Sequence, residues 1–424
     1  MLPATRFATL PSCAHQAGHS VTHPRGFRAA GVAAGVKRSG RLDVGLLVSD
    51  LPCVSAAFFT RNAAAAAPVR ITRESADCGS LRACVVNSGN ANAYTGEEGT
   101  AAALCMRAAA AKALRLPAHE VAVASTGVIG VPLPLERVER GIDEAARQLA
   151  SDGGLRFASA IRTTDRGPKR GALSVRVPGG EVRLGFAAKG AGMICPSMAT
   201  MLCFITSDAA LEAEAWQRLV GEAVAGSFNR ITVDGQESTN DTVVALANGA
   251  SGVRLDEEGR EAVGEALRAA LTALAVAIVA DGEGASTVVR LSVTGAADER
   301  EAAAVARAIA DSPLVKTAFY GGDPNWGRVA QAAGQALARL CGQLPDAAAF
   351  GAPLCLDIAY GPVTVVAGDR QRELDQAEQR MLRHHLEQAE VDLHVHLRRG
   401  PAATGLYFSD LTHQYVTLNA ECTT

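Results

Sequence analysis

Four short clusters carry the side chains best suited to chemistry in this chain of 424 residues. They lie beside apolar runs and span Asn87 to Ala93, Ser125 to Gly130, Lys189 to Met193 and Met198 to Leu202. A positioned hydroxyl can act as a nucleophile, and backbone N–H groups exposed by glycine can bind an oxyanion. Each cluster taken singly also has an ordinary structural interpretation, because Asn and Gly form turns and a single lysine is usually solvated.

Several other catalytic signatures are missing from the sequence, namely a P-loop, a GxGxxG after a strand, a GxSxG elbow and an HExxH helix. The nine histidines cluster late, with His384 and His385 near His394 and His396. The last two share one face of an alternating strand, residues 391 to 398, with Asp392. This pattern favours a solvated face over a metal site. A histidine-based catalytic triad is therefore not expected.

Charge and cysteine content restrict the class of partner and the compartment. Lys plus Arg number 41 and Asp plus Glu 44, so the net charge of −3 gives no field toward nucleic acid or an anionic bilayer. A small neutral or zwitterionic substrate fits better. Lysine is scarce, and a site that needs a compact ammonium must use Lys37, Lys112, Lys169, Lys189 or Lys316. The ten cysteines form no CxxC pair, which indicates reduced thiols in a cytoplasmic protein.

The elements that must position these clusters alternate between short β-rich runs and Ala-rich helical runs, which predicts an α/β or layered α+β protein of two or three structural units. Because 48% of residues are apolar and only 4% aromatic, closely approaching backbones should form the interior. Strands are expected at 43–49, 53–60, 81–86, 121–125 and 201–206, with a hairpin at 173–186. Helices are expected at 100–114, 134–149, 212–228, 257–280, 299–310 and 371–389.

Four finer expectations concern the ends of these elements. Thr95 and Glu98 form a capping-box pattern before the helix at 100–114. The apolar stretch Ala269 to Ala280 is shorter than the ~20 residues that span a bilayer, so it predicts a buried helix. Residues 1 to 24 lack acidic residues and a long apolar run, and we expect a short disordered N-terminal extension. A smaller second domain is expected at about 295 to 400.

In combination, the clusters closely resemble the ArgJ family, the glutamate N-acetyltransferase or ornithine acetyltransferase of arginine biosynthesis. The resemblance runs over almost the full length, in the family's order. It rests on residues 26–37, 39–43, 86–92, 125–130, 163–165, 189–202, 238–241, 281–285, 312–317, 323–328 and 419–424.

This resemblance implies an N-terminal-nucleophile type of α/β sandwich, as in DmpA and ArgJ proteins, with a smaller C-terminal α/β domain. Family members are precursors that cleave themselves before a threonine, and the Ala199-Thr200 bond matches that position. Cleavage would free the Thr200 α-amine, which with a reference pKa near ~8 can serve as base for its own hydroxyl. The implied fragments are residues 1–199 and 200–424, assembled as α2β2, and no metal or organic cofactor is implied.

The resemblance also implies a role for each remaining site residue. Thr126 and Gly127 match the oxyanion hole. The implied substrate contacts are Thr163, Lys189, Thr200, Glu283, Asn419 and Thr424. Thr164 is an alternative to Thr163. Glu283 could instead belong to a plain helix-ending turn with left-handed Gly282, and the C-terminal residues to a fraying tail.

The implied reaction moves an acetyl group from N2-acetyl-ornithine to Thr200 and then to glutamate, giving ornithine and N-acetylglutamate. Acetyl-CoA is an alternative donor on which the sequence does not decide. The chain departs from the family at Gln236, Glu237 and Cys422, which concerns substrate range and rate more than reaction type. Two other functions stay open: an amidase or aminopeptidase of the same fold, and a non-catalytic amino-acid-binding protein.

Overall fold

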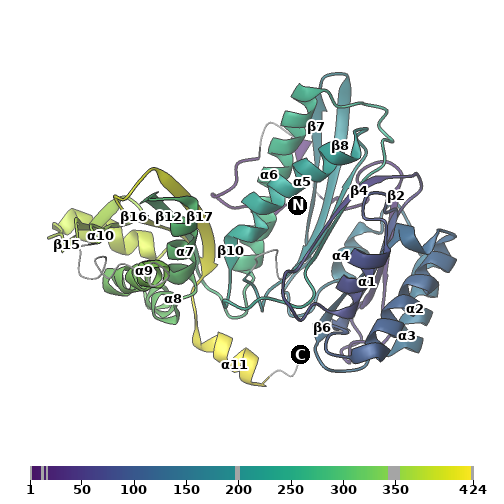
Figure 1. Cartoon of the computed structure of the whole chain (residues 1–424), viewed down its shortest axis with the longest axis horizontal. Helices are drawn as coiled ribbons and strands as arrows, with labels where there is room; N and C mark the ends of the chain where they lie inside the picture. The colour runs from purple at the N-terminus through teal and green to yellow at the C-terminus, as the bar shows by residue number, and fades with distance from the viewer. Residues whose placement is uncertain (1, 11–13, 16–17, 196–200, 342–353, 422–424) are drawn as a thin grey trace. The chain divides into compact units, whose positions relative to one another are not determined.

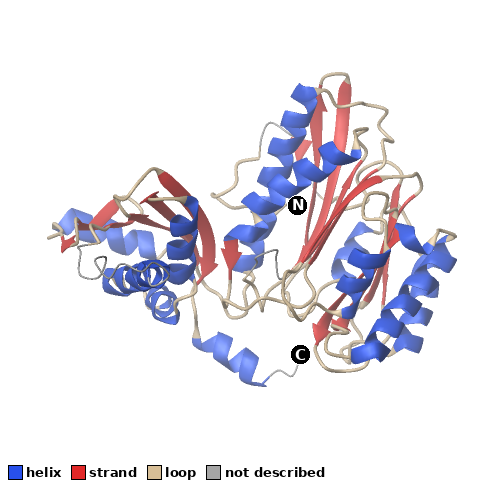
Figure 2. Cartoon of the chain, viewed as in Figure 1, coloured by secondary structure: helices blue, strands red, loops and turns tan. Residues whose placement is uncertain are grey.

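The structure is a computed structural model that describes residues 2–10, 14–15, 18–195, 201–341 and 354–421. Two compact units are present. Unit 1 comprises Met1–Asn229, Gln236–Ile278 and Thr423–Thr424, and unit 2 comprises Arg230–Gly235 and Val279–Cys422. Helices and strands alternate in both units, as Figure 2 shows. The two units are described separately below.

Unit 1 contains a six-stranded sheet in the order β1-β7-β8-β9-β11-β4. Its strands are β1 (Ala14–His15), β4 (Val54–Phe59), β7 (Lys169–Val177), β8 (Gly180–Lys189), β9 (Leu202–Ser207) and β11 (Thr242–Ala247). β9 lies at the centre, antiparallel to β8 and parallel to β11. All six residues of β9 are buried, as its continuous apolar run predicts. The strand that follows Thr200 is therefore hydrogen-bonded to a neighbouring strand on each side.

The second sheet of unit 1 has four strands in the order β2-β3-β5-β6. These are β2 (Phe27–Val32), β3 (Val44–Ser49), β5 (Ala83–Asn90) and β6 (Val121–Val128). Successive residues of its strands join different buried clusters, with Leu47 and Val86 in one and Leu46 and Val85 in the other. Both faces of the sheet are thus covered, which explains the dense apolar runs.

The buried cluster that contains Leu47 is here called the inner core. It joins the two sheets, because it also contains Phe204 and Val244 of the six-stranded sheet. Helix α4 (Gly154–Ala160) supplies Phe157, whose ring meets that of Phe204 edge to face at 5.0 Å. The remaining helices of unit 1 are α1 (Ala67–Ser75), α2 (Gly96–Leu114), α3 (Leu135–Arg147), α5 (Ala213–Gly226) and α6 (Glu257–Ala280) (Figure 1). Short 3-10 turns occur at η1 (Ala118–Glu120) and η2 (Phe228–Arg230).

Unit 2 contains a seven-stranded sheet in the order β10-β17-β12-β16-β13-β14-β15. The strands are β10 (Ile231–Thr232), β12 (Val288–Ala296), β13 (Asp357–Tyr360), β14 (Val363–Ala367), β15 (Arg370–Gln371), β16 (Glu390–His396) and β17 (Ala402–Ser409). Its helices are α7 (Glu299–Ala310), α8 (Pro313–Tyr320), α9 (Trp326–Cys341), α10 (Gln376–Leu386) and α11 (His413–Glu421). One apolar core joins the sheet to α7, α8, α9 and α10.

Most predicted elements are present within a few residues of their expected ends, and α6 and α7 have the expected bounds. α10 begins at Gln376 rather than at 371, because Asp375 forms a complete capping box with Glu378. Helices α1, α4, α8, α9 and α11 were not predicted. In the described chain, α6 alone is long and apolar enough to cross a membrane, and 67% of its apolar window is buried inside the protein.

Two predictions about the ends of elements are wrong. Thr95 makes no side-chain cap for α2, because its backbone, with φ −110° and ψ 10°, is not extended as that of an N-cap residue usually is. Its hydroxyl donates to Asn92 Oδ1 at 2.7 Å. The N-terminal extension is not disordered where the structure describes it. Leu2 is 3% exposed, Val21 joins the inner core and β1 pairs with β7. Apolar burial and strand pairing order this segment.

Candidate active site

The six-stranded sheet aligns the residues next to the predicted nucleophile. Lys189 of β8, Leu202 of β9 and Thr242 of β11 lie opposite one another, and Phe59 of β4 completes the row. Leu202 is two residues beyond Thr200 in the sequence. Ala199 and Thr200, and with them the predicted cleavage bond, fall outside the described residues.

Thr126 and Gly127 lie near the end of β6, beside the parallel strand β5. Gly127 has φ +137°, and a Cβ there would lie 2.3 Å from the Gly89 carbonyl carbon. A side chain cannot fit in that space, and this φ is one that glycine tolerates best. The glycine therefore permits the two backbones to approach closely, as expected for a turn that presents N–H groups to an oxyanion.

Lys189 ends β8 and is only 8% exposed. Its Nζ lies 3.2 Å from Thr126 Oγ1, so the lysine and the predicted oxyanion hole are neighbours. The alternative of an ordinary solvated lysine is therefore wrong. A buried ammonium is a strong partner for a carboxylate, since little water competes for it.

A buried carboxylate, Asp165, supports the end of β8. It accepts hydrogen bonds from Lys169 Nζ at 2.7 Å and from the Gly190 N–H at 2.8 Å. Burial alone would raise the pKa of Asp165, but the charges of Lys169 and Lys189 hold that pKa below its usual range. Asp165 also accepts the Thr163 N–H at 3.1 Å, which ties the predicted substrate threonine to the same point.

A second buried carboxyl, Asp241, lies beside the strand that follows Thr200. It accepts the backbone N–H of Met201 and a hydrogen bond from Ser238. Burial raises the pKa of Asp241 well above its ordinary value, against the opposing effects of Met201, Ser238 and the Lys189 charge.

A cavity of about 620 Å³ is lined by Gly127 and by both candidate threonines, Thr163 and Thr164. Thr163 is half-buried and Thr164 is exposed, so the structure does not choose between them. Lys37, Arg38 and Arg41 make part of its wall basic. Burial lowers the pKa of Lys37 to about 8, and its Nζ donates to the Leu42 carbonyl at 2.8 Å. The cavity is large enough for an amino-acid derivative.

Two of the other predicted substrate residues, Glu283 and Asn419, belong to unit 2. Asn419 of α11 donates through Nδ2 to Glu283 Oε2 at 2.9 Å, which brings two of them together. Glu283 follows α6, but the left-handed residue there is Gly284 with φ +74°, not Gly282. Burial raises the pKa of Tyr415 to about 12, with contributions from the charges of Asp234 and Glu283. Thr424 and Cys422 lie outside the described residues.

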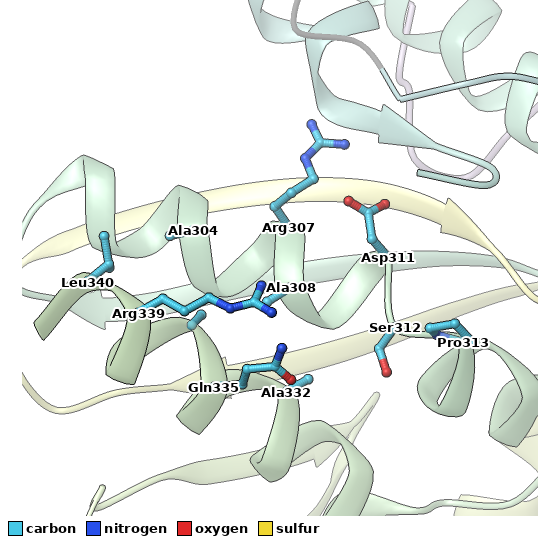
Figure 3. A pocket seen from close by; sticks show the side chains of 11 residues that line it. Ala304, Arg307, Ala308, Asp311, Ser312, Pro313, Ala332, Gln335, Arg339 and Leu340 are labelled. Carbon is cyan, nitrogen blue, oxygen red and sulfur yellow. The ribbon is translucent and has the colours of Figure 1, made fainter. Parts of the chain in front are cut away.

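Unit 2 also contains a hollow of about 470 Å³ between α7, α8 and α9. Figure 3 shows Arg307, Asp311 and Ser312 on one side of it and Gln335 and Arg339 on the other. None of the predicted site residues lines it. We therefore assign this hollow no role in acyl transfer.

Among the described residues there is no group of three or more His, Cys, Asp or Glu side chains that could hold a metal ion. His394 and His396 are exposed on β16, and His396 Nδ1 lies 2.9 Å from Thr294 Oγ1. Asp392, expected on the same solvated face, is only 7% exposed because it pairs with Arg290 Nε at 2.6 Å.

Comparison with known proteins gives the family. The family model described as "ArgJ family" matches residues 28–424. The chain belongs to the ArgJ family. The arginine biosynthesis bifunctional protein ArgJ of Nitratidesulfovibrio vulgaris is 44% identical over 399 residues, which cover 94% of this chain and 98% of that protein. The ArgJ protein of Thermosynechococcus vestitus is 44% identical over 416 residues, or 95% and 98% of the two chains.

A solved structure of ornithine acetyltransferase complexed with ornithine, from Mycobacterium tuberculosis, is 42% identical. It covers 44% of this chain and 99% of its own, with a TM-score of 0.41. ArgJ family membership and the two α/β units confirm the predicted fold class. The predicted enzyme class, an acyltransferase of arginine biosynthesis, is confirmed by the family.

Sequence reasoning gave no role to Asp165, Asn240 or Asp241, although their motifs contribute to the family resemblance. All three are buried polar residues with hydrogen-bond partners far away in the sequence or on a neighbouring strand. The signal that could have identified them is the pair of motifs Thr-Thr-Asp and Ser-Thr-Asn-Asp. Both place a carboxyl or amide in a run too polar for an ordinary core strand.

Proposed function

We propose that this ArgJ protein transfers an acetyl group from N2-acetyl-L-ornithine to L-glutamate through Thr200. The Thr200 hydroxyl attacks the acetyl carbonyl and ornithine leaves with its amine protonated. The glutamate amine then attacks the acetyl-threonine ester, which gives N-acetylglutamate and restores the hydroxyl. The Thr200 α-amine, freed by self-cleavage after Ala199, takes up and returns the proton.

The observation that carries this proposal is the placement of Lys189. Its buried ammonium lies 3.2 Å from Thr126 Oγ1 and opposite Leu202, the first residue of the strand that follows Thr200. The cation that we propose binds carboxylate, the turn that we propose binds the oxyanion and the strand that follows Thr200 therefore lie close together in unit 1. Both substrates of the proposed reaction carry an α-carboxylate, and both pass through a tetrahedral oxyanion.

Each residue then has one role. Thr126 and Gly127 donate to the oxyanion, and Lys189 binds the substrate α-carboxylate. Thr163 contacts the substrate from the wall of the cavity that Gly127 also lines. In unit 2, the Glu283 carboxylate suits the side-chain ammonium of ornithine, and Asn419 holds that carboxylate through its 2.9 Å hydrogen bond. Thr424 completes the proposed substrate contacts.

The proposal includes no metal or organic cofactor. The fragments 1–199 and 200–424 assemble as α2β2 and work in the cytoplasm. Acetyl-CoA is an alternative acetyl donor for the same reaction, since only the molecule that acetylates Thr200 in the first step would change.

The test is incubation of the purified protein with acetyl-ornithine and glutamate, with and without acetyl-CoA, followed by detection of N-acetylglutamate. The expected product appears with acetyl-ornithine, and Thr200→Ala abolishes both the product and self-cleavage. Thr317→Ala, an exposed threonine on α8, is the matched control and should retain both. Efficient cutting of Thr200→Ala would remove Thr200 from the reaction.

The same assay separates the two other functions. A hydrolase of this fold would release free acetate when glutamate is present, because water rather than an amine attacks the acyl-enzyme. A non-catalytic amino-acid-binding protein would run as one intact band near 43.7 kDa on a denaturing gel.

A further inference from the structure

The side chain of Asn240 connects two parts of unit 1 that the proposed reaction must hold together. Its Nδ2 group donates to the Ala91 carbonyl at 2.6 Å and to the Ser125 carbonyl at 2.9 Å. Ala91 directly follows β5, and Ser125 is the residue before Thr126. Both amide hydrogens are thus used to join the two strand ends where Gly127 makes its close approach.

The backbone around Asn240 reaches the strand of the nucleophile at the same time. The next residue, Asp241, accepts the Met201 N–H through its carboxylate, and the Thr242 N–H donates to the Met201 carbonyl at 3.1 Å. Met201 directly follows Thr200. The Asn240 side chain therefore bonds the oxyanion turn, and the two residues after Asn240 bond the start of β9.

Asn240 itself has little freedom to move. It is 6% exposed, and its Oδ1 accepts the Thr239 hydroxyl at 2.6 Å. Its own N–H donates to Ser238 Oγ at 3.1 Å, and its carbonyl accepts the Thr242 hydroxyl at 3.0 Å. A side chain with this many hydrogen bonds fixes the segments that it contacts relative to one another, because shifting it breaks several buried hydrogen bonds at once.

We infer that Asn240 is a positioning residue that sets the distance between the oxyanion donors at Thr126-Gly127 and Met201, where the strand of the nucleophile begins. This inference rests on the proposed acyl transfer. Oxyanion stabilisation depends on donors being fixed where the charge develops, and a misplacement of about 1 Å can cost ~100-fold in rate. Asn240 contacts no reacting atom, so its effect should fall on kcat and leave substrate KM nearly unchanged.

The test compares Asn240→Ala with Asn248→Ala in the full chain. Asn248 is a matched buried amide at the other end of β11, where Nδ2 donates to the Arg25 carbonyl at 2.9 Å and to Ser49 Oγ at 3.1 Å. Both variants lose similar hydrogen bonds, so both should unfold at a lower temperature than the wild type. Only Asn240→Ala should lower kcat of acetyl transfer, by at least ~30-fold, with KM for acetyl-ornithine and glutamate within about threefold.

Trapping with acetyl-ornithine alone provides a second readout. The rate at which the Thr200 peptide gains acetyl mass should fall in Asn240→Ala and not in Asn248→Ala. A variant that folds like the control but neither cuts itself nor transfers acetyl also supports the inference, because both reactions form an oxyanion on the attacked carbonyl. A kcat within threefold of the wild type would overturn it.

If Asn240→Ala does not fold, Asn240→Ser retains one donor and is measured in its place, with the same expected direction. Failure of both variants to fold while Asn248→Ala folds would make Asn240 a stability residue only, and would overturn the inference. Failure of the proposed function is a different result, because the wild type itself would then form no N-acetylglutamate.

Discussion

At the scale of single residues, the ammonium of Lys189 has an environment that its sequence neighbours do not show. It is 8% exposed, and its charge, with that of Lys169, holds the pKa of buried Asp165 below its usual range. The same Lys189 charge only opposes the rise that burial causes in the pKa of Asp241. An ion in such surroundings attracts a substrate carboxylate more strongly than a surface lysine would. Its removal should therefore have a large and specific effect on substrate.

We expect Lys189→Met to lower kcat/KM by at least ~30-fold for both acetyl-ornithine and glutamate. The charge is lost while much of the bulk is kept, so a substrate carboxylate loses its partner at a cost of ~2 to 5 kcal/mol. Self-cleavage should change less, since no free carboxylate takes part. Lys112→Met, on the exposed side of α2, is the control. Near-native kcat/KM for both substrates in a normally cut Lys189→Met would exclude the proposed role.

The residues that we propose do the chemistry carry signals in the sequence, whereas the residues that hold them do not. Lys189 is one of five lysines and lies beside glycines, so its type and spacing indicate a site. Asp165 and Asn240 gain their meaning from partners such as Gly190 and Ser125, 25 and 115 residues away. Without the fold, neither spacing nor residue type specifies those pairs.

At the scale of elements, the parallel pair β5 and β6 ends in backbones so close that only glycine fits at position 127. We expect Gly127→Ala to reduce acetyl transfer by ~100-fold or more, because an added Cβ must push the turn away from Gly89 and displace the proposed donor. Gly130→Ala is the matched control. Gly130 also has a positive φ of +79°, but a Cβ there meets nothing within 4 Å.

The measurement for this pair is the acetyl-transfer rate together with the thermal midpoint of each variant. Gly130→Ala should lose only ~1 kcal/mol from backbone strain and keep a rate within threefold of the wild type. Equal rates in the two variants would show that the close approach at Gly127 is not used for catalysis.

The N-terminal segment gives a pH-dependent prediction. Burial lowers the pKa of His23 to about 4, assisted by the charges of His19 and Arg183 and opposed by Glu181. The unfolded chain therefore binds a proton near pH 6.5 that the folded chain refuses until about pH 4, so stability falls as pH falls between these values. His23→Gln should remove about 1 kcal/mol of this loss, after allowance for solvent screening of the half-exposed ring.

The check is the thermal midpoint of wild type and His23→Gln at pH 7 and pH 4.5. The difference between the two pH values should be smaller in the variant. The exposed His119, changed to Gln, is the control and should follow the wild type. Parallel curves for all three proteins would contradict the assignment.

The positions of elements were more predictable than their ends and their contacts. α6 and α7 have the expected bounds because long Ala-rich periodic runs leave little choice. The Thr95 cap failed because the backbone of Thr95, with φ −110° and ψ 10°, is not in the extended conformation that N-cap residues usually adopt. The N-terminal extension was misjudged because its apolar residues form no long run, yet single ones such as Leu2 and Val21 are buried.

At the scale of the whole molecule, the proposed cut would not divide the six-stranded sheet into two halves. β9 and β11 belong to the fragment 200–424, and they lie between β8 and β4, which belong to the fragment 1–199. Strands of one fragment are thus enclosed by strands of the other. All described strands of unit 2, by contrast, come from the second fragment.

We therefore expect the two fragments to stay together after cleavage. A denaturing gel should show two bands, while size-exclusion chromatography should give one species at about twice the 43.7 kDa of the intact chain, as α2β2 requires. Separation should need denaturant, because six paired residues join β11 to β4 and six join β8 to β9. Elution of free fragments in native buffer would contradict the interleaved sheet as the source of cohesion.

Because β8, β9, β11 and β4 interleave, the backbone cut should also report whether a given molecule has folded. The strand after Thr200 is seated only when segments from both sides of the bond have already paired around it. We therefore expect self-cleavage only after the chain has folded, and the cleaved bond is not formed again. The ratio of cut to uncut protein during synthesis should thus serve as a clock for maturation, which can be followed by sampling newly made protein over time.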